Sequence, residues 1–433
     1  MNGLGPTEAG RTEVKKSVWI INHYAGTMYL DKGGRHYWFA KYLARMGYEP
    51  LIICSNTLHE KPETVVPDDK LWCDRFAEEI RTPFVFIAGK AYQGNGIGRV
   101  RNILEFYRNV LKSCRQIADK YGKPDVVLAS SIHPLAPAAG IRIARRFGAK
   151  CICEYRDLWP DELICMGAMS ENGIPARLLR GIEHRTYKKA DALVFTMEGG
   201  PQYIRDRGWD TESGGDVDLS KAYYINNGVD LEAFAENAKT HTLNDPDLSD
   251  ERTFKIIYTG MIRRANGIDR ILDVAKRLKD DPRIRFLLYG PGSEAELLEK
   301  RIREEDISNV VYKGNVNKQY IPFVLSKGDL NVLNYMNGDL FRYGCSNNKL
   351  FEYMASGKPI LCTIKMKYSI IEKYGCGAEI DASDCDEAVK VIQAFSQHPD
   401  LAKNYAENAV KAVEDFDFKK LSETLDRIIR TIK

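Results

Sequence analysis

The stretch with the clearest chemical signature is FRYGCSNNKLFEYMASGKPIL, residues 341–361. Turn formers occupy its first part, and a helical pattern follows over 349–356, with Gly357 as the C-cap. The start of such a helix presents free N–H groups and a positive dipole end, and Lys349 adds a charge, so a pyrophosphate fits there. Glu352 lies on the first turns, where its carboxylate can accept hydrogen bonds from the vicinal hydroxyls of a ribose. The alternative is a solvated carboxylate that the helix dipole favours.

Glycines precede helical patterns at two other points. Gly33 and Gly34 stand before the first long helical pattern, and Gly290 and Gly292 occur in YGPGSEAELLE. A glycine allows a ligand to approach the backbone closely, although a plain flexible loop is the alternative for the first pair. The sequence contains no G-x-G-x-x-G, which argues against a dinucleotide-dependent oxidoreductase.

Charged side chains follow several predicted strands. Arg263 and Arg264 come after one strand, where a guanidinium can meet a phosphate. Arg156 and Asp157 in EYRDLWPDE follow another and can bind sugar hydroxyls or phosphate, unless the pair only braces its loop. His133 in SSIHPLAP stands at the same edge of the sheet, as a structural or a catalytic histidine.

The elements that must position these side chains form two series of short apolar runs, each run followed by a helical stretch. The runs predict strands at 18–21, 50–54, 84–88, 126–129, 150–154, 192–196 and 223–225, and then at 255–259, 285–289, 310–312, 330–333, 359–362 and 378–380. This alternation favours an α/β fold with two Rossmann-like domains, whose parallel sheets face a central cleft.

The domain boundaries follow from composition. The polar segment 231–253 lacks a sustained strand pattern and is interpreted as the interdomain connection. We therefore assign residues 1–235 to an N-terminal acceptor-side domain and 236–415 to a C-terminal nucleotide-binding domain. The helix expected over 416–433 packs back on the first domain or stands apart, and the sequence leaves this open.

Composition excludes several classes of protein. The 433 residues include 44% hydrophobic and 28% charged side chains, as in globular proteins, and no apolar run is long enough to cross a bilayer. The net charge of +3 argues against a general nucleic-acid binder. The ten cysteines lack the spacing of a zinc site, and the polar start is not a secretory signal. We expect a cytoplasmic protein with reduced thiols.

At these residues the chain resembles the retaining GT-B glycosyltransferases of family 4, also called glycosyl transferases group 1. The landmarks that agree in order are GGRHYW, EYRDLWPDE, YYINNGVD, YTGMIRRANG, LLYGPG, VVYKGNV and KLFEYMASGKP. They are most similar to the branch that builds bacterial surface polysaccharides, such as lipopolysaccharide or capsule, from nucleotide-activated amino or deoxy sugars. The resemblance implies transfer from a nucleoside diphosphate sugar, UDP by frequency, to a glycan or lipid-linked acceptor, with no metal or other cofactor.

The residue patterns and the resemblance together assign roles. The expected donor-binding residues are Gly33, Gly34, Arg263, Arg264, Gly290, Gly292, Gly344, Cys345, Ser346, Asn347, Asn348, Lys349 and Glu352, and the expected catalytic residues are Arg156, Asp157 and His133.

Two positions depart from the family pattern. The family has two glutamates eight positions apart, and Glu352 matches the second, whereas Gly344 stands in place of the first. Backbone N–H groups of residues 344–346 are the candidate substitute. Asn266 stands where the family usually has a lysine, so the diphosphate must depend on an arginine, Lys349 and helix N-termini. A non-catalytic nucleotide-sugar-binding protein and a GT-B-fold epimerase are the alternatives.

One helical segment carries a second hypothesis. Residues 94–190 have an excess of eight positive charges, and within 97–115 apolar side chains recur every three or four positions among arginines and lysines. The stripe consists of Ile97, Val100, Leu104, Tyr107, Leu111 and Cys114. Such a helix lies on an anionic membrane surface, with 177–189 as a second basic surface, or packs its stripe on the sheet. Membrane binding by this helix would place the protein at the inner face of the cell membrane.

Overall fold

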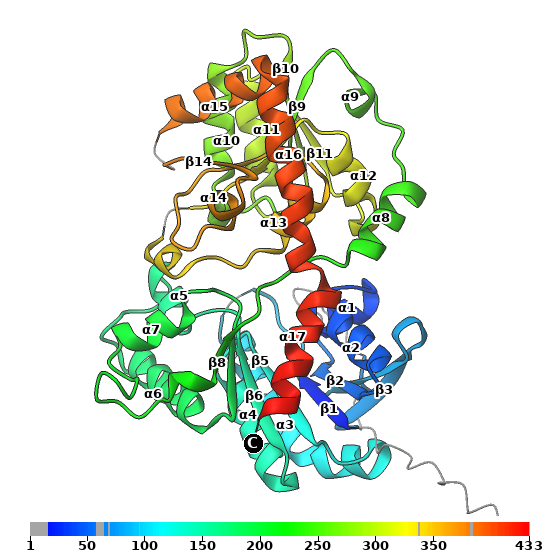
Figure 1. The fold of residues 1–433 in the computed structure, drawn as a ribbon, viewed down its shortest axis with the longest axis vertical. Coiled ribbons are helices and arrows are strands. Elements are labelled where there is room, and N and C mark those ends of the chain that lie inside the picture. Colours follow the sequence, from blue (N-terminus) through cyan, green and yellow to red (C-terminus); the bar gives the residue numbers. More distant parts are fainter. Residues whose placement is uncertain are drawn as a thin grey trace, which may run out of the picture.

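The computed structural model describes residues 16–57, 65–67, 70–94, 96–336, 338–381 and 384–432. These residues form two α/β domains, one above the other in Figure 1, each with its own sheet and helices on both faces. The expectation of two Rossmann-like domains with parallel sheets is therefore confirmed.

The first sheet has eight strands in the order β3-β4-β2-β1-β5-β6-β7-β8. The strands are β1 (Ser17–Ile21), β2 (Glu49–Ser55), β3 (Trp72–Ala77), β4 (Thr82–Ile87), β5 (Val126–Ser131), β6 (Lys150–Tyr155), β7 (Ala192–Phe195) and β8 (Ala222–Tyr224). All neighbours pair in parallel except β3, which is antiparallel to β4. The sequence patterns located every strand but β3, a half-exposed edge strand with no buried face to impose an apolar pattern.

The second sheet has six parallel strands in the order β11-β10-β9-β12-β13-β14. The strands are β9 (Phe254–Thr259), β10 (Ile284–Tyr289), β11 (Val310–Gly314), β12 (Leu330–Leu333), β13 (Ile360–Cys362) and β14 (Gly377–Glu379). In both sheets the central strands are buried on both faces, which explains why they are continuous apolar runs in the sequence.

Helices connect the strands of each domain. The first domain contains α1 (Gly26–Leu30), α2 (Arg35–Arg45), α3 (Ile97–Tyr121), α4 (Leu135–Phe147), α5 (Asp161–Cys165), α6 (Ile174–Lys189) and α7 (Gly200–Asp206). The later helices are α8 (Leu231–Thr240), α9 (Pro246–Ser249), α10 (Ile268–Arg277), α11 (Ala295–Glu304), α12 (Ile321–Ser326), α13 (Asn348–Ala355), α14 (Ile370–Tyr374), α15 (Cys385–Gln397), α16 (Pro399–Val413) and α17 (Phe418–Thr431). Short 3₁₀ turns include η3 (Arg264–Asn266), η4 (Lys318–Tyr320) and η5 (Asp339–Tyr343).

The chain crosses between the domains twice, and the two crossings lie side by side. The backbone N–H of Val229 donates to the carbonyl of Phe416 over 3.1 Å, and the N–H of Phe418 donates to the carbonyl of Val229 over 3.0 Å. After the first crossing, α8 packs on α12 of the second domain, so the sequence-based boundary at 235 falls inside a helix. The polar segment 231–253 therefore contains α8 and α9.

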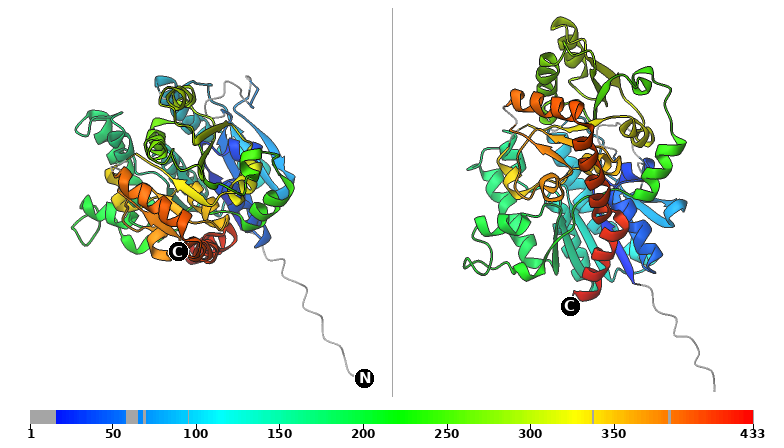
Figure 2. Two further views of the ribbon diagram at one scale, coloured as in Figure 1. Left: turned by 90° about the horizontal axis from the view of Figure 1, so that it is seen from above. Right: turned by 45° about the horizontal axis from the view of Figure 1, so that its top comes forward.

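The second crossing ends with α17, which returns to the first domain. Figures 1 and 2 show α16 and α17 as a column that runs along both domains. The apolar side chains of α17 join the core cluster that also contains α2, and the rings of Phe39 and Phe418 meet edge to face at 5.6 Å. The last helix thus completes the core of the first domain.

Candidate active site

A cavity of about 370 Å³ lies between the two domains and has walls from both. The first domain contributes Gly33 and Gly34, and the second contributes Asn348 and Glu352. Its size is within the range of small-molecule sites. Four of the residues that the sequence pointed to therefore line one cavity. Residues 317–319 at η4 also line it, and no motif in the sequence pointed to them.

Glu352 lies half-buried on α13 in this cavity. Burial raises the pKa of its carboxyl group, and Lys318 and Lys349 oppose that shift. The helix begins at Asn348, with Asn347 as the cap, whose side chain accepts from the N–H of Lys349 over 2.9 Å. The expected helix start therefore forms. The carboxylate of Glu352 faces the cavity rather than bulk solvent.

Lys349 lies over the end of β9. Its Nζ is 3.1 Å from the hydroxyl of Tyr258 and 4.7 Å from the centre of that ring. Gly260, with a φ of +143°, makes room for the side chain, because a Cβ there would approach Lys349 Cε to 2.9 Å. Burial and the neighbouring Arg263 lower the Lys349 pKa to about 8. No described carboxylate forms an ion pair with this ammonium, so the environment favours an anionic ligand.

The two arginines after β9 differ in their surroundings. Both are exposed, but only Arg263 lowers the pKa of Lys349. Arg264 begins η3. Asn266, at the position of the family lysine, is buried and braces the loop: its Nδ2 donates to the Met261 carbonyl over 2.7 Å. The lysine at the end of β9 is instead Lys349, which reaches it from α13.

Gly290 and Gly292 are required by backbone packing. A Cβ on Gly290 would lie 1.9 Å from the carbonyl oxygen of Gly260, and a Cβ on Gly292 would lie 1.8 Å from that of Ile262. Side chains are thus excluded here because the loops after β9 and β10 touch, and this contact gives a structural reason for both glycines.

The segment 344–346 is held at the interface between the domains. Gly344 has a φ of +88°, and its N–H donates to the Phe341 carbonyl over 3.1 Å. That N–H is therefore already engaged within the loop, and the expectation that N–H groups of residues 344–346 substitute for the first glutamate stays a prediction. Burial raises the pKa of the neighbouring Cys345 thiol to about 11. The Ser346 hydroxyl donates to Asn226 Oδ1 of the first domain over 2.6 Å.

His133 is buried at the end of β5. Its Nε2 is 3.1 Å from Nδ1 of His23, and its own Nδ1 has no hydrogen-bond partner. Burial, His23 and Arg99 hold the His133 pKa well below its ordinary value, so the imidazole is neutral at pH 7. His23 is a neighbour that the sequence did not single out.

Arg156 and Asp157 are half-buried after β6, and Arg156 Nε has no hydrogen-bond partner. Burial raises the Asp157 pKa against the effect of Arg156 and Arg99. Glu162, on α5, has a pKa raised to about 8 by burial and by Asp157. Arg99 from α3 influences both carboxyl groups. Sequence reasoning missed Arg99 and Glu162; the final glutamate of EYRDLWPDE was the only available signal for either.

Comparison with known proteins agrees with this architecture. The family model described as "Glycosyl transferase 4-like domain" matches residues 34–213, and the model described as "Glycosyl transferases group 1" matches residues 241–412. The chain belongs to the family-4 glycosyltransferases of GT-B fold. This confirms the resemblance found in the sequence.

Individual relatives of this glycosyltransferase are distant. The probable glycosyltransferase WbjE of Pseudomonas aeruginosa is 21% identical over 387 residues, covering 88% of this chain and 89% of WbjE. The putative colanic acid biosynthesis glycosyl transferase WcaI of Escherichia coli K12 is 22% identical over 223 residues, 50% of this chain and 52% of WcaI. The crystal structure of Anabaena HepE in complex with UDP-glucose has a TM-score of 0.63 at 14% identity, covering 96% and 99% of the two chains.

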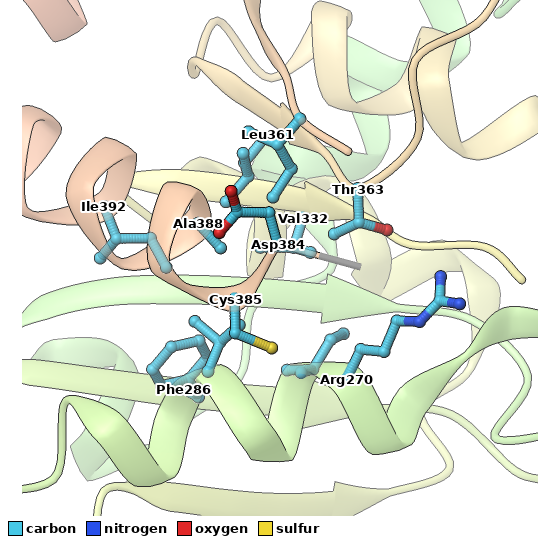
Figure 3. A pocket seen from close by; sticks show the side chains of 12 residues that line it. Arg270, Phe286, Val332, Leu361, Thr363, Asp384, Cys385, Ala388 and Ile392 are labelled. Carbon is cyan, nitrogen blue, oxygen red and sulfur yellow. The ribbon is translucent and has the colours of Figure 1, made fainter. Parts of the chain in front are cut away.

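A smaller cavity of this glycosyltransferase lies apart from the interdomain site. Figure 3 shows it in the second domain, between α10, α15 and the sheet, with mostly apolar side chains such as Phe286, Leu361 and Ile392 around it. Its volume is about 20 Å³, enough for one water molecule. None of the residues predicted to bind the donor or the acceptor lines it.

Two features are absent from the described residues. No group of three or more His, Cys, Asp and Glu side chains among them is arranged to hold a metal ion. No helix in the same part of the glycosyltransferase is both long and apolar enough to span a membrane.

Proposed function

We propose that this glycosyltransferase moves a sugar, an amino or deoxy hexose, from a UDP-linked donor to a glycan or lipid-linked acceptor during synthesis of a bacterial surface polysaccharide. The names of relatives support the pathway: WcaI is described as a colanic acid biosynthesis glycosyl transferase. HepE, which shares the fold, has been crystallised with UDP-glucose and supports the donor class.

The observation that carries the proposal is the ammonium of Lys349, which lies beside Arg263 at the end of β9 and forms no ion pair with a described carboxylate. Negative charge develops on the diphosphate as the bond between the donor sugar and the diphosphate breaks. Fixed cations and dipoles that already face this position stabilise that charge, by about 3 to 4 kcal/mol for one good contact. Lys349, Arg263 and the N-terminus of α13 are the groups that we assign to this task.

Glu352 would bind the ribose, because it lines the interdomain cavity and lies about one helical turn from Lys349. Gly33 and Gly34 close the cavity from the first domain and allow the donor to approach the backbone. No cofactor is part of the proposal.

On the acceptor side we assign Asp157, Arg156 and His133. The carboxyl of Asp157, next to Glu162 and Arg99, is suited to hold an acceptor hydroxyl. His133 is neutral and offers hydrogen bonds rather than charge. We propose retention of the anomeric configuration through front-face attack, with the leaving phosphate taking the acceptor proton.

A ligand screen followed by product analysis tests the proposal. UDP and UDP-sugars should raise the melting temperature more than GDP, dTDP and their sugars do, because a ligand that binds only the folded state stabilises it. An α-linked product from an α-linked donor would support retention. Stabilisation by GDP-sugars alone would reject the UDP donor, and an epimerised donor without acceptor would indicate an epimerase.

We further propose that the first domain binds an anionic membrane surface. Ile97, Val100 and Leu104 of α3 are 88%, 57% and 47% exposed. These three do not pack on the sheet, whereas Cys114 at the other end of the stripe is buried. Arg99, Arg101 and Arg108 of α3 lie within four positions of these three residues in the sequence, and Ile174 and Leu178 of the basic helix α6 are exposed as well.

A further inference from the structure

Tyr343 belongs to the second domain in sequence but to the first domain in packing. It ends η5, immediately before Gly344, and only 2% of its surface is exposed. Its ring joins the hydrophobic cluster of the first domain, and Leu340 from the same turn packs against that cluster. A side chain of the donor-side loop is therefore inserted into the body of the opposite domain.

The socket for Tyr343 is formed around α7. The hydroxyl of Tyr343 donates to Asp206 over 2.7 Å, and the N–H of Gly199 donates to the carbonyl of Tyr343 over 3.0 Å. The ring meets that of Tyr203 edge to face at 5.4 Å. Gly199 has no room for a side chain, because a Cβ would lie 2.6 Å from the Cα of Tyr343.

The socket is tied to the acceptor-side segment. The hydroxyl of Tyr203 donates to Asp161 over 2.5 Å, and Asp161 is the first residue of α5. Arg180 also pairs with Asp161, at 2.8 Å. In addition, α5 contacts η5 directly. The end of EYRDLWPDE thus supports the turn that carries Tyr343.

Ser346 attaches the other end of the same loop to the first domain. Its hydroxyl donates to Asn226 Oδ1 over 2.6 Å, and its carbonyl accepts from Asn227 Nδ2 over 3.3 Å. Arg35, the first residue of α2 after Gly34, donates to the carbonyl of Asn226 over 2.6 Å. Arg35 in turn forms a buried ion pair with Glu154 at 2.7 Å. This end of the loop is held by a buried network that begins beside Gly34.

We propose that Tyr343 is a positioning residue, which docks segment 344–346 on the first domain and so aligns it with the donor sugar only when the two domains are closed. In place of the first glutamate of the family, the sequence has a glycine between two anchors, Tyr343 and Ser346. Docking of the loop and closure of the cleft are then one event. The inference rests on the proposed function only in naming the donor sugar as what the loop contacts.

Three variants and one control test the docking. Tyr343→Ala removes the side chain, Tyr343→Phe keeps the ring, and Gly199→Ala forces the loop out of its socket without altering the second domain. Gly181→Ala in α6 is the matched control, because a Cβ there meets nothing within 4 Å. The readouts are kcat and KM of transfer, UDP affinity by calorimetry, and hydrogen exchange of residues 339–347.

We expect kcat to fall about tenfold or more in Tyr343→Ala and Gly199→Ala, since small displacements of reacting groups have effects of this size. UDP affinity should stay within about threefold of the wild type, because the assigned nucleotide contacts are otherwise intact. Tyr343→Phe should retain most of kcat, and Gly181→Ala all of it. Exchange of 339–347 should accelerate in Tyr343→Ala and Gly199→Ala only.

Two results would overturn the inference: folded Tyr343→Ala and Gly199→Ala with unchanged kcat, or a loss of UDP affinity equal to the loss of kcat/KM. If the wild type transfers no sugar from any donor, the proposed function fails on its own. The exchange experiment then still decides the docking, because equal exchange of 339–347 in wild type and variants would reject it without any ligand.

Discussion

At the scale of single residues, Lys349 shows how position sets the charge available for binding. Its pKa of about 8 reflects burial and the proximity of Arg263, both of which disfavour the ammonium form. A bound diphosphate would reverse this balance, because it favours the charged form. Binding of the nucleotide and protonation of Lys349 are therefore linked.

This linkage predicts a pH dependence. Below pH 8 Lys349 is charged in the free protein, and above it the ammonium is progressively lost, so UDP affinity should fall by about tenfold between pH 7.5 and 9.5. The phosphate itself is fully ionised over this range. Calorimetry at several pH values, in buffers of different ionisation enthalpy, should also show proton uptake near pH 8.5. In Lys349→Arg the affinity should not vary with pH, since guanidinium stays charged; a flat wild-type profile would contradict the assignment.

Glu352 offers a second test at this scale. Glu352→Gln keeps the shape of the side chain but replaces an acceptor oxygen with a donor, so UDP binding should weaken by about 1 to 3 kcal/mol. Calorimetry at pH 7 measures the change. Glu299→Gln on α11 is the control, because that residue is exposed and does not line the cavity. Equal affinity of Glu352→Gln and wild type would remove Glu352 from the nucleotide site.

At the scale of elements, α17 links the end of the chain to the first domain. Phe418, Leu421, Leu425, Ile428 and Ile429 are all buried in the cluster that includes α2. The apolar stripe of this helix packs in the core of the first domain, so its burial stabilises the fold of that domain. The helix also holds the two interdomain crossings together through the hydrogen bonds between Val229 and residues 416–418.

Leu425→Ala should therefore lower the free energy of unfolding by about 2 to 5 kcal/mol, through lost burial and the cavity that remains. Thermal and urea unfolding measure the change. Glu423→Ala, an exposed position on the same helix, should change the stability by less than about 0.5 kcal/mol. Equal stability of the two variants would show that α17 contributes little to the first domain.

At the scale of the whole molecule, the proposed membrane-binding face combines the exposed apolar side chains of α3 and α6. Helices α3 and α4 contact each other, as do α4 and α6, so the three lie side by side. A surface with apolar side chains among basic ones suits an anionic lipid headgroup layer. Placed this way, the face would bring a lipid-linked acceptor near the first domain.

Vesicle sedimentation tests this face. Wild type should pellet with vesicles of anionic lipid at low salt. It should pellet much less with neutral vesicles or at high salt, because each basic residue near the surface contributes about 1 kcal/mol of electrostatic attraction and salt screens that attraction. Ile97→Ser with Val100→Ser should reduce binding, whereas Leu401→Ser, exposed on α16 of the other domain, should leave it unchanged. Negligible pelleting of wild type under all conditions would make this face an ordinary solvated surface.

The sequence by itself determined the class of fold and most of the strands, because strands buried on both faces must be continuous apolar runs. It also determined the start of α13, where Asn347 caps the helix, and with it the placing of Lys349 and Glu352 one turn apart. These are local properties, which depend on neighbours in the chain. The edge strand β3 and the helix α8 lack such a pattern and were not found.

Only the tertiary structure decided which residues that are far apart in sequence contact each other. Lys349 lies at the end of β9, ninety residues away in sequence, and Tyr343 enters the core of the opposite domain. It also separated two kinds of glycine: Gly33 and Gly34 line the cavity, whereas Gly290 and Gly292 are required by contact between loops. Such contacts join residues that are far apart in sequence, and their free energy depends on the packing of both domains, so no local pattern of residue types encodes them.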